Sequence, residues 1–402
     1  MKKKSVAIIG TVGVPANYGG FETLAEHLID HIGGRYNLHV YCSGKKYKKE
    51  ERKETYKNAK LHYVPLDANG VQSIPYDTWS ILHALFFADV LLILGVSGAW
   101  LLPLVKLFTK KKIISSIDGI EWKRNKWNMI AKWYLFWAEG LAVKYSHIDI
   151  SDNEAIQDYT AQRYNTLSRI IEYGADHTIP SNGTTKNAEY PFMANPYAFK
   201  VCRIEPENNV HVVLKAFSEM PEYRLVMVGN WNNSGYGQNL KETYTAFPNI
   251  TILDPIYNQE KLDLIRSNAV LYIHGHSAGG TNPSLVEAMY LSLPIVTFGV
   301  SYNKVTTENK ALYFTTEDEL KHIIQNTKLS DIRNLGKTMG EVAKRRYTWK
   351  LIADKYDGLV QEALQARKKP SVAAATDELP YDELLNMGLS HIKYTEGFYT
   401  QR

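Results

Sequence analysis

The chain has 402 residues, of which 45% are hydrophobic and 22% are charged, and its formal net charge is +5. Such values are typical of a globular protein of two or three domains, and they exclude a disordered chain, a collagen and a membrane-embedded bundle. Two cysteines, Cys42 and Cys202, are too few for a disulfide framework or a cysteine-rich zinc site, so a reducing, cytoplasmic location is expected.

The first half of the chain alternates apolar strands with helices. Helical spacing of apolar residues begins at Phe21 and runs to Ile32, and further helices are predicted at 128–145 and 153–164. Apolar runs predict buried strands at 5–9, 38–42, 90–94, 113–116, 148–150 and 169–171.

One segment resembles a signal peptide and another resembles a membrane-spanning helix, but neither has the uninterrupted apolar run that such a segment needs. The basic start of the chain leads into about five apolar residues and a glycine-rich turn, which indicates a buried strand rather than a signal peptide. The apolar stretch 79–108 is interrupted by Asp89, by the 95–98 turn and by Pro103. It is therefore interpreted as a helix, a strand and a second short helix, because a spanning helix needs about 20 uninterrupted apolar residues.

The same rhythm restarts after a break rich in glycine and proline at 174–197. Strands are predicted at 199–202, 225–228, 250–253, 270–273 and 295–298, with helices at 210–219, 259–267, 283–291 and within 330–366. We therefore expect a first domain over 1–177, a linker over 178–196, a second domain over 197–345, a helix over 346–368 that packs back on the first domain, and a tail over 369–402.

Apolar strands that alternate with helices predict an α/β fold with two doubly wound, Rossmann-like parallel-sheet domains facing a cleft. Ligands of such sheets bind at the carboxyl ends of the strands, so the loops after strands are the places to look for chemistry. Three of these loops are distinctive.

The first loop, 10–22, carries Gly19, Gly20 and Glu22 at the start of a helix. It lacks the G-x-G-x-x-G spacing of a dinucleotide site, which disfavours a dehydrogenase. Glycines at a helix start allow backbone N–H groups to approach an anion, and a plain tight turn is the alternative.

The second loop, 115–124, follows a strand with two carboxylates, Asp118 and Glu121, and two cations, Lys123 and Arg124. A binding or catalytic role is one interpretation, and local ion pairing is the other.

The third loop, 274–289, turns at a glycine pair into a helix that begins at Pro283. Gly280, Thr281 and Asn282 there would present N–H groups to a diphosphate, and Glu287 would accept hydrogen bonds from sugar hydroxyls. His274 and His276 have no third partner in sequence, so no metal site is predicted. Arg203, after the first strand of the second domain, is placed to reach the same phosphates.

Positive charge gathers at 45–60 and at 110–132, where tryptophans interleave with it. A surface that rests on anionic lipid is one interpretation, because Trp favours the membrane interface and Lys and Arg meet the headgroups. A solvated face is the alternative, and nucleic acid is disfavoured because no recognition motif accompanies the charge.

Together these motifs resemble the family 4 glycosyltransferases of the GT-B fold, in particular the bacterial rhamnosyltransferase-like branch that assembles surface polysaccharides such as capsule. The similar segments are Pro-Ala-x-Tyr-Gly-Gly-Phe-Glu-Thr (15–23), Asp-Gly-Ile-Glu-Trp-Lys-Arg-x-Lys-Trp (118–127), Tyr-Gly-Ala-Asp (173–176), Arg-Ile-Glu-Pro-Glu-Asn-Asn-Val (203–210) and Gly-Gly-Thr-Asn-Pro-Ser-Leu (279–285). The wider family's first donor-site Glu falls here on Gly279, and its phosphate-binding Lys falls on Asn208.

The resemblance implies a retaining, metal-independent transferase without a cofactor, which moves L-rhamnose from dTDP-rhamnose to a lipid-diphosphate-linked sugar at the inner face of the cytoplasmic membrane. It implies catalytic roles for Asp118, Lys123, Arg203 and Glu207, and substrate binding by Gly19, Gly20, Glu22, Glu121, Gly280, Thr281, Asn282 and Glu287. The alternatives are another nucleotide-sugar donor, a nucleotide-sugar epimerase on the same fold, and an inactive sugar-binding protein.

Overall fold

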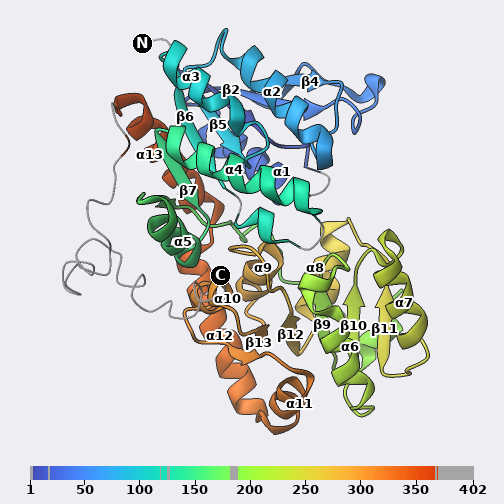
Figure 1. The fold of residues 1–402 in the computed structure, drawn as a ribbon. Coiled ribbons are helices and arrows are strands. Elements are labelled where there is room, and N and C mark those ends of the chain that lie inside the picture. Colours follow the sequence, from blue (N-terminus) through green and yellow to red (C-terminus); the bar gives the residue numbers. More distant parts are fainter. Residues whose placement is uncertain are drawn as a thin grey trace, which may run out of the picture. The chain divides into compact units, whose positions relative to one another are not determined.

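The computed structural model describes residues 3–16, 19–117, 119–124, 127–181, 189–366 and 369. The chain divides into two compact units, each built on its own sheet (Figure 1). The first unit contains the chain up to Tyr173 together with the chain from Trp349 onward, and the second contains Gly174–Thr348.

Eight described strands form the sheet of the first unit, in the order β3-β4-β2-β1-β5-β6-β7-β8. All neighbours run parallel except β3 and β4, which form an antiparallel edge. The strands are β1 (Ser5–Ile9), β2 (Asn37–Ser43), β3 (Thr55–Tyr56), β4 (Ala59–Val64), β5 (Val90–Leu94), β6 (Lys112–Ser116), β7 (Ile148–Ser151) and β8 (Arg169–Ile170). The six strands predicted here are confirmed; β3 and β4 were not predicted.

The helices of the first unit are α1 (Gly20–Ile32), α2 (Ser73–Ala84), α3 (Leu102–Phe108), α4 (Met129–Tyr145), α5 (Glu154–Tyr164) and α13 (Trp349–Gln365). The stretch 79–108 forms a helix, a buried strand and a short helix, as its sequence predicts. Within the described ranges, every helix is too short or too polar to cross a lipid bilayer.

Helix α13 is separated in sequence from the rest of the first unit but belongs to its core. Trp349 is buried and stacks on His27 of α1, with the ring centroids 4.2 Å apart. Tyr36 Oη donates to Asp357 Oδ1 at 2.6 Å, and Arg169 pairs with Glu362 at 2.7 Å. The last described helix therefore supplies one wall of the first unit's core.

Six described strands form the sheet of the second unit, in the order β11-β10-β9-β12-β13-β14, and all neighbours run parallel. They are β9 (Ala198–Val201), β10 (Leu225–Val228), β11 (Ile250–Leu253), β12 (Leu271–His274), β13 (Ile295–Phe298) and β14 (Leu312–Phe314). This is the doubly wound order 3-2-1-4-5-6, and the winding reverses between β9 and β12.

The helices of the second unit are α6 (Val210–Ser218), α7 (Gly235–Tyr244), α8 (Gln259–Ser267), α9 (Pro283–Tyr290), α10 (Ser301–Thr306), α11 (Glu317–Asn326) and α12 (Leu329–Arg346). The predicted starts of α6, α8 and α9 are confirmed. The segment expected as a linker, 178–196, lies within the second unit where it is described, and residues 182–188 of it lie outside the described ranges. The chain passes between the units at Tyr173–Gly174, earlier than the sequence indicated.

Because Trp349 joins α13 to α1, its truncation should destabilise the first unit. We expect Trp349→Ala to lower the free energy of unfolding by about 3–5 kcal/mol, the usual cost of removing a large buried aromatic side chain. Urea denaturation measures this free energy of unfolding. It is monitored by circular dichroism, because that signal does not rely on tryptophan fluorescence.

The matched control is Lys350→Ala, one residue further along α13, whose side chain is 77% exposed and pairs with Asp354 on the surface. It should change the unfolding free energy by no more than about 0.5 kcal/mol. Equal losses in both variants would contradict a core role for Trp349.

Candidate functional site

In the second unit, the reversal of winding brings two loops together at the carboxyl ends of β9 and β12. These strands are hydrogen-bonded neighbours, with Ala198 opposite Leu271 and Phe199 opposite Tyr272. After β9 the chain turns toward α6 through residues 202–209, and after β12 it turns toward α9 through residues 275–282. A switch point of this kind is where open α/β sheets bind ligands.

Hydrogen bonds join the two loops to each other. Within the first loop, Asn208 Nδ2 donates to the carbonyl oxygen of Arg203 at 2.8 Å. Between the loops, Asn208 Oδ1 lies 2.8 Å from His276 Nδ1. Asn209 Nδ2 donates to the carbonyl of Gly275 at 2.8 Å, and the Ser277 N–H donates to the carbonyl of Glu207 at the same distance. The two loops therefore form one rigid surface.

Gly275 is required where these loops meet. A Cβ atom on this residue would lie 2.3 Å from the carbonyl oxygen of Asn208 and 2.8 Å from Nζ of Lys200. Real side chains do not approach backbone this closely, so any larger residue would push the two loops apart.

Arg203, predicted to bind phosphate, presents its side chain to solvent at this surface. It is 47% exposed, and its nearest carboxylate is Glu205, with Nε 4.0 Å from Oε2. The guanidinium is thus only weakly engaged within the chain. Glu207, predicted as a catalytic residue, is instead nearly buried, and its carbonyl oxygen accepts hydrogen bonds from both the N–H and the hydroxyl of Ser277.

The turn before α9 offers backbone donors. Asn282 caps the helix, because its Oδ1 accepts from the N–H of Ser284 at 3.1 Å. This cap occupies a helix N–H that the sequence indicated would face a ligand. Among the described residues, the N–H groups of Gly279 and Gly280 donate to no partner, so backbone donors remain open in the glycine turn before the helix. Thr281 beside them is buried.

Glu287, predicted to bind sugar hydroxyls, is held inside the unit by a buried ion-pair cluster. Arg266 of α8 donates to Glu287 and, at 2.9 Å, to Asp263, while His177 Nε2 lies 3.2 Å from the other oxygen of Glu287. Burial by itself would raise the pKa of Glu287, but Arg266 and His177 lower it to about 2. The carboxylate is therefore ionised, 14% exposed and committed to internal partners.

Sequence reasoning missed Arg266. It lies in a correctly predicted helix, three residues after Asp263, and this spacing is typical of an ordinary surface ion pair. Nothing local marks it as fully buried, because its burial depends on residues far away in the sequence, such as Glu287 of α9.

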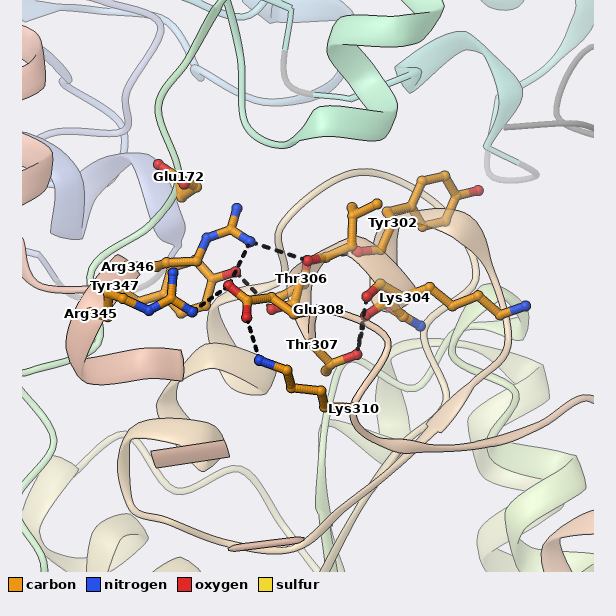
Figure 2. Close-up of polar contacts among 12 residues, drawn as sticks. Glu172, Tyr302, Lys304, Thr306, Thr307, Glu308, Lys310, Arg345, Arg346 and Tyr347 are labelled. Carbon is orange, nitrogen blue, oxygen red and sulfur yellow. Dashed lines mark hydrogen bonds and ion pairs between the residues drawn. The ribbon is translucent and has the colours of Figure 1, made fainter. Parts of the chain in front are cut away.

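Helix α10 binds the loop after β12 through two side chains, and the end of α12 binds α10. Tyr302 of α10 donates to the carbonyl of Ser277 at 3.0 Å, and Asn303 donates to the carbonyl of His276 at 2.8 Å. Figure 2 shows the next layer, in which cations converge on Glu308: Lys310 at 2.9 Å, Arg345 at 2.6 Å and Arg346 at 3.5 Å.

The same layer continues into α10 through the backbone. Arg346 donates to the carbonyl of Val305, and Tyr347 donates to the carbonyl of Thr306 at 2.7 Å (Figure 2). The end of α12 thus fixes α10, and α10 fixes the loop that carries His276 and Ser277.

In the first unit, the predicted glycine turn lies at the start of α1. Gly19 has a φ of 113°, and a Cβ there would lie 2.1 Å from a carboxylate oxygen of Glu22. The other oxygen of Glu22 accepts the N–H of Val12 at 2.6 Å. The buried Glu22 therefore closes the turn, while Gly20 begins the helix.

In the loop after β6, charged side chains form contacts with other residues of the same loop. Glu121 accepts a hydrogen bond from Trp127 Nε1 at 2.9 Å and pairs with Arg124 at 3.0 Å. Lys123 lies over the ring of Trp122, 5.5 Å from its centroid, and burial, with Arg163 nearby, lowers its pKa. Asp118 lies outside the described residues. In the described part of the chain, no group of three metal-binding side chains comes together.

Two family models match the chain. Residues 184–345 match the model described as "Glycosyl transferases group 1", and residues 3–176 match a domain of unknown function, DUF1972. Comparison with curated protein sequences finds no match.

Solved structures resemble about nine tenths of the chain. Sucrose-phosphate synthase from Thermosynechococcus elongatus is 14% identical with a TM-score of 0.73, covering 90% of this chain and 99% of its own. A glycosyltransferase from Rickettsia africae is 13% identical and has a TM-score of 0.69. The similarity covers 91% of this chain and 100% of that one. Anabaena HepE in complex with UDP and glucose is 13% identical and has a TM-score of 0.68. The similarity covers 89% of this chain and 100% of that one.

The chain has the GT-B fold. The family match over the second unit supports a group 1 glycosyltransferase, which agrees with the resemblance noted in the sequence. Neither comparison identifies the rhamnosyltransferase-like branch.

The buried cluster around Arg266 gives a stability prediction. Arg266→Gln should lower the free energy of unfolding by about 3–5 kcal/mol, because it leaves Asp263 and Glu287 buried without their cation. Urea denaturation at pH 7 measures the loss. The control is Lys261→Gln on the same helix, whose exposed pair with Glu189 should contribute little to the free energy of unfolding. A loss in Arg266→Gln no larger than in the control would show that the cluster is not stabilising.

Proposed function

We propose that this protein is a retaining glycosyltransferase that moves L-rhamnose from dTDP-rhamnose to a lipid-diphosphate-linked sugar in bacterial surface polysaccharide synthesis. The observation that carries the proposal is the surface at the switch point of the second unit. It joins a half-exposed guanidinium, that of Arg203, to the free N–H groups of Gly279 and Gly280 on a rigid pair of loops.

These groups suit the departure of a nucleoside diphosphate. Charge accumulates on the diphosphate as the bond to the sugar breaks, and preorganised donors that meet this charge lower the barrier. Arg203 is able to approach two phosphate oxygens at once with its planar fork, and the glycine turn supplies uncharged donors beside it. We propose that this set does the work without a divalent metal or another cofactor.

The first unit is proposed to bind the acceptor. Lys123 would hold a phosphate of the lipid-linked acceptor, and Asp118 would orient or deprotonate the attacking hydroxyl. Burial, with Arg163 nearby, lowers the pKa of Lys123, while Glu139 opposes that shift. Gly19 and Gly20 add backbone donors at the start of α1.

A different nucleotide sugar is the alternative. Anabaena HepE was solved with UDP and glucose, and that neighbour favours a UDP-hexose donor as the second candidate. An inactive sugar-binding protein is the non-enzymatic alternative.

A donor screen tests the proposal. The full chain is incubated with dTDP-rhamnose, UDP-glucose and other nucleotide sugars, with and without EDTA, and released nucleoside diphosphate is measured in the presence of membrane extract as acceptor. Release from dTDP-rhamnose that survives EDTA is expected. Release from UDP-hexoses alone would favour the second candidate, loss on chelation would contradict metal independence, and no release from any donor would contradict the enzymatic proposal.

Arg203→Ala should lower the turnover number by about 10²- to 10³-fold, as expected when a preorganised donor to the leaving group is removed. The melting temperature should stay near that of the wild type, because the side chain is half-exposed and only weakly paired. Steady-state kinetics with the donor identified in the screen measures the effect. Arg224→Ala serves as a charge-matched control in the same unit, and wild-type turnover in Arg203→Ala would refute the role.

The membrane proposal rests on a face of the first unit. Helices α2, α3 and α4, with the residues next to α2 and α3, carry large apolar side chains that are exposed to solvent, such as Phe86 at 88%. This apolar face comprises Trp79, Leu82, Phe86, Trp100, Leu104, Leu107, Phe108, Met129, Ile130, Trp133, Phe136 and Trp137. Helices α3 and α4 pack on each other, and Trp100 Nε1 donates to Thr78 of α2. The three helices belong to the first unit (Figure 1).

An apolar face of this extent marks an interaction site, and its tryptophans and flanking lysines suit a lipid interface. Part of the basic segment 110–132 is engaged within the chain. Lys112 donates to the carbonyl of Ala366, while Lys110 stays exposed. We therefore propose that insertion of apolar side chains, more than charge, attaches the protein to the inner face of an anionic membrane.

The double variant Phe86→Ser, Trp133→Ser should bind anionic phosphatidylglycerol vesicles at least tenfold more weakly than the wild type. Burying one such side chain contributes about 1.5–3 kcal/mol. Co-sedimentation at two salt concentrations measures binding. Tyr257→Ser, an exposed aromatic of the second unit, is the control and should bind as the wild type does. Undiminished binding of the double variant would contradict the assignment of this face.

A further inference from the structure

Lys200 is a charged residue in the middle of a buried strand. It lies in β9, it is 1% exposed, and Met227 of β10 is its partner in the parallel register. Because side chains alternate along a strand, Lys200 shares a face with Ala198, and both Ala198 and Met227 belong to the apolar core beneath α6. An apolar side chain would be expected here.

The ammonium of Lys200 ends at the switch point. Its Nζ lies 2.8 Å from the place that a Cβ of Gly275 would occupy, directly behind the loop after β12. The absence of a side chain at Gly275 therefore opens a gap that the ammonium fills.

No counter-charge is present at this position. Among the described residues, no carboxylate lies within 4 Å of Nζ, and the titratable neighbours that act on Lys200 or feel its charge are the Cys202 thiol and the His274 imidazole. Burial lowers the pKa of Lys200. A buried ammonium without a partner is strongly unfavourable, in contrast to Arg266 of the same unit, which has two carboxylates.

Other polar atoms nearby also lack partners. His274 Nε2 is buried without a hydrogen bond, and so is Oγ1 of Thr297, which lies opposite His274 in the register of β12 and β13. The loops 202–209 and 275–282 contain one arginine, Arg203, and no lysine. A diphosphate carries at least two negative charges, so Arg203 leaves part of this charge unmatched.

We propose that Lys200 is the second cation of the diphosphate subsite and acts from beneath the loop at the Gly275 gap; this inference rests on the proposed function. The ligand class is a nucleoside diphosphate, with or without its sugar. Binding supplies the anion that the ammonium lacks, and the ammonium supplies the charge that Arg203 alone does not.

The test compares Lys200→Met with the wild type. Calorimetry measures the affinity for dTDP, for UDP and for thymidine, which lacks phosphate. Removing a charged hydrogen-bond partner should weaken the binding of the diphosphates roughly 10- to 100-fold and leave thymidine binding unchanged. Lys215→Met on α6 is the control, since it removes the same charge from an exposed pair with Glu317 and should bind as the wild type does.

A second measurement needs no variant. In the wild-type protein, the side-chain NMR resonances of Lys200 should show its pKa rising when dTDP binds. Unchanged diphosphate affinity in Lys200→Met, equal weakening in Lys215→Met, or no change of this pKa on binding would each overturn the inference. A wild-type protein that binds no nucleoside diphosphate would instead refute the proposed function itself.

Discussion

The second unit depends on the pairing of β9 with β12 at the point where the winding of its sheet reverses. Because these two strands are neighbours, the loops that leave them must meet, and both end on the same edge of the sheet. Asn209 and Ser277 then bind the loops to each other through backbone carbonyls, and the side chain of Asn208 does so through the His276 imidazole. A surface for a ligand follows from the topology, and its rigidity follows from these side chains.

The support of that surface extends outward in layers. Tyr302 and Asn303 hold the loop after β12, and α10, which carries them, is held in turn by the end of α12 through Glu308 (Figure 2). Backbone donors in a glycine turn are useful only if they stay in place when charge develops on the ligand, since reorganisation at that moment would consume the stabilisation. The layers provide this stiffness without occupying the turn itself.

Buried charge divides into two kinds in this unit. Arg266, Asp263 and Glu287 satisfy one another, so their cost of burial is offset within the fold. Lys200 is buried without such compensation, and its ammonium lies at the switch point beside Gly275. The first unit shows the corresponding contrast for apolar groups: Trp349 is enclosed by α1 and α13, whereas the face formed by α2, α3 and α4 leaves large side chains in solvent.

The sequence by itself determined the α/β class, most strands and helices, and the loops on which Arg203 and the glycine turn lie, because apolar periodicity, Gly and Pro are local signals. Strands β3 and β4 escaped prediction, since β3 has only two residues and Lys60 and His62 interrupt the apolar run of β4. Only the tertiary structure decided which polar groups are free. Glu287 and Glu22 carry carboxylates that suit a ligand, yet Arg266 and the N–H of Val12 already hold them. Lys200 looks like any lysine in the chain, and its burial beside Gly275 arises from contacts between residues far apart in sequence.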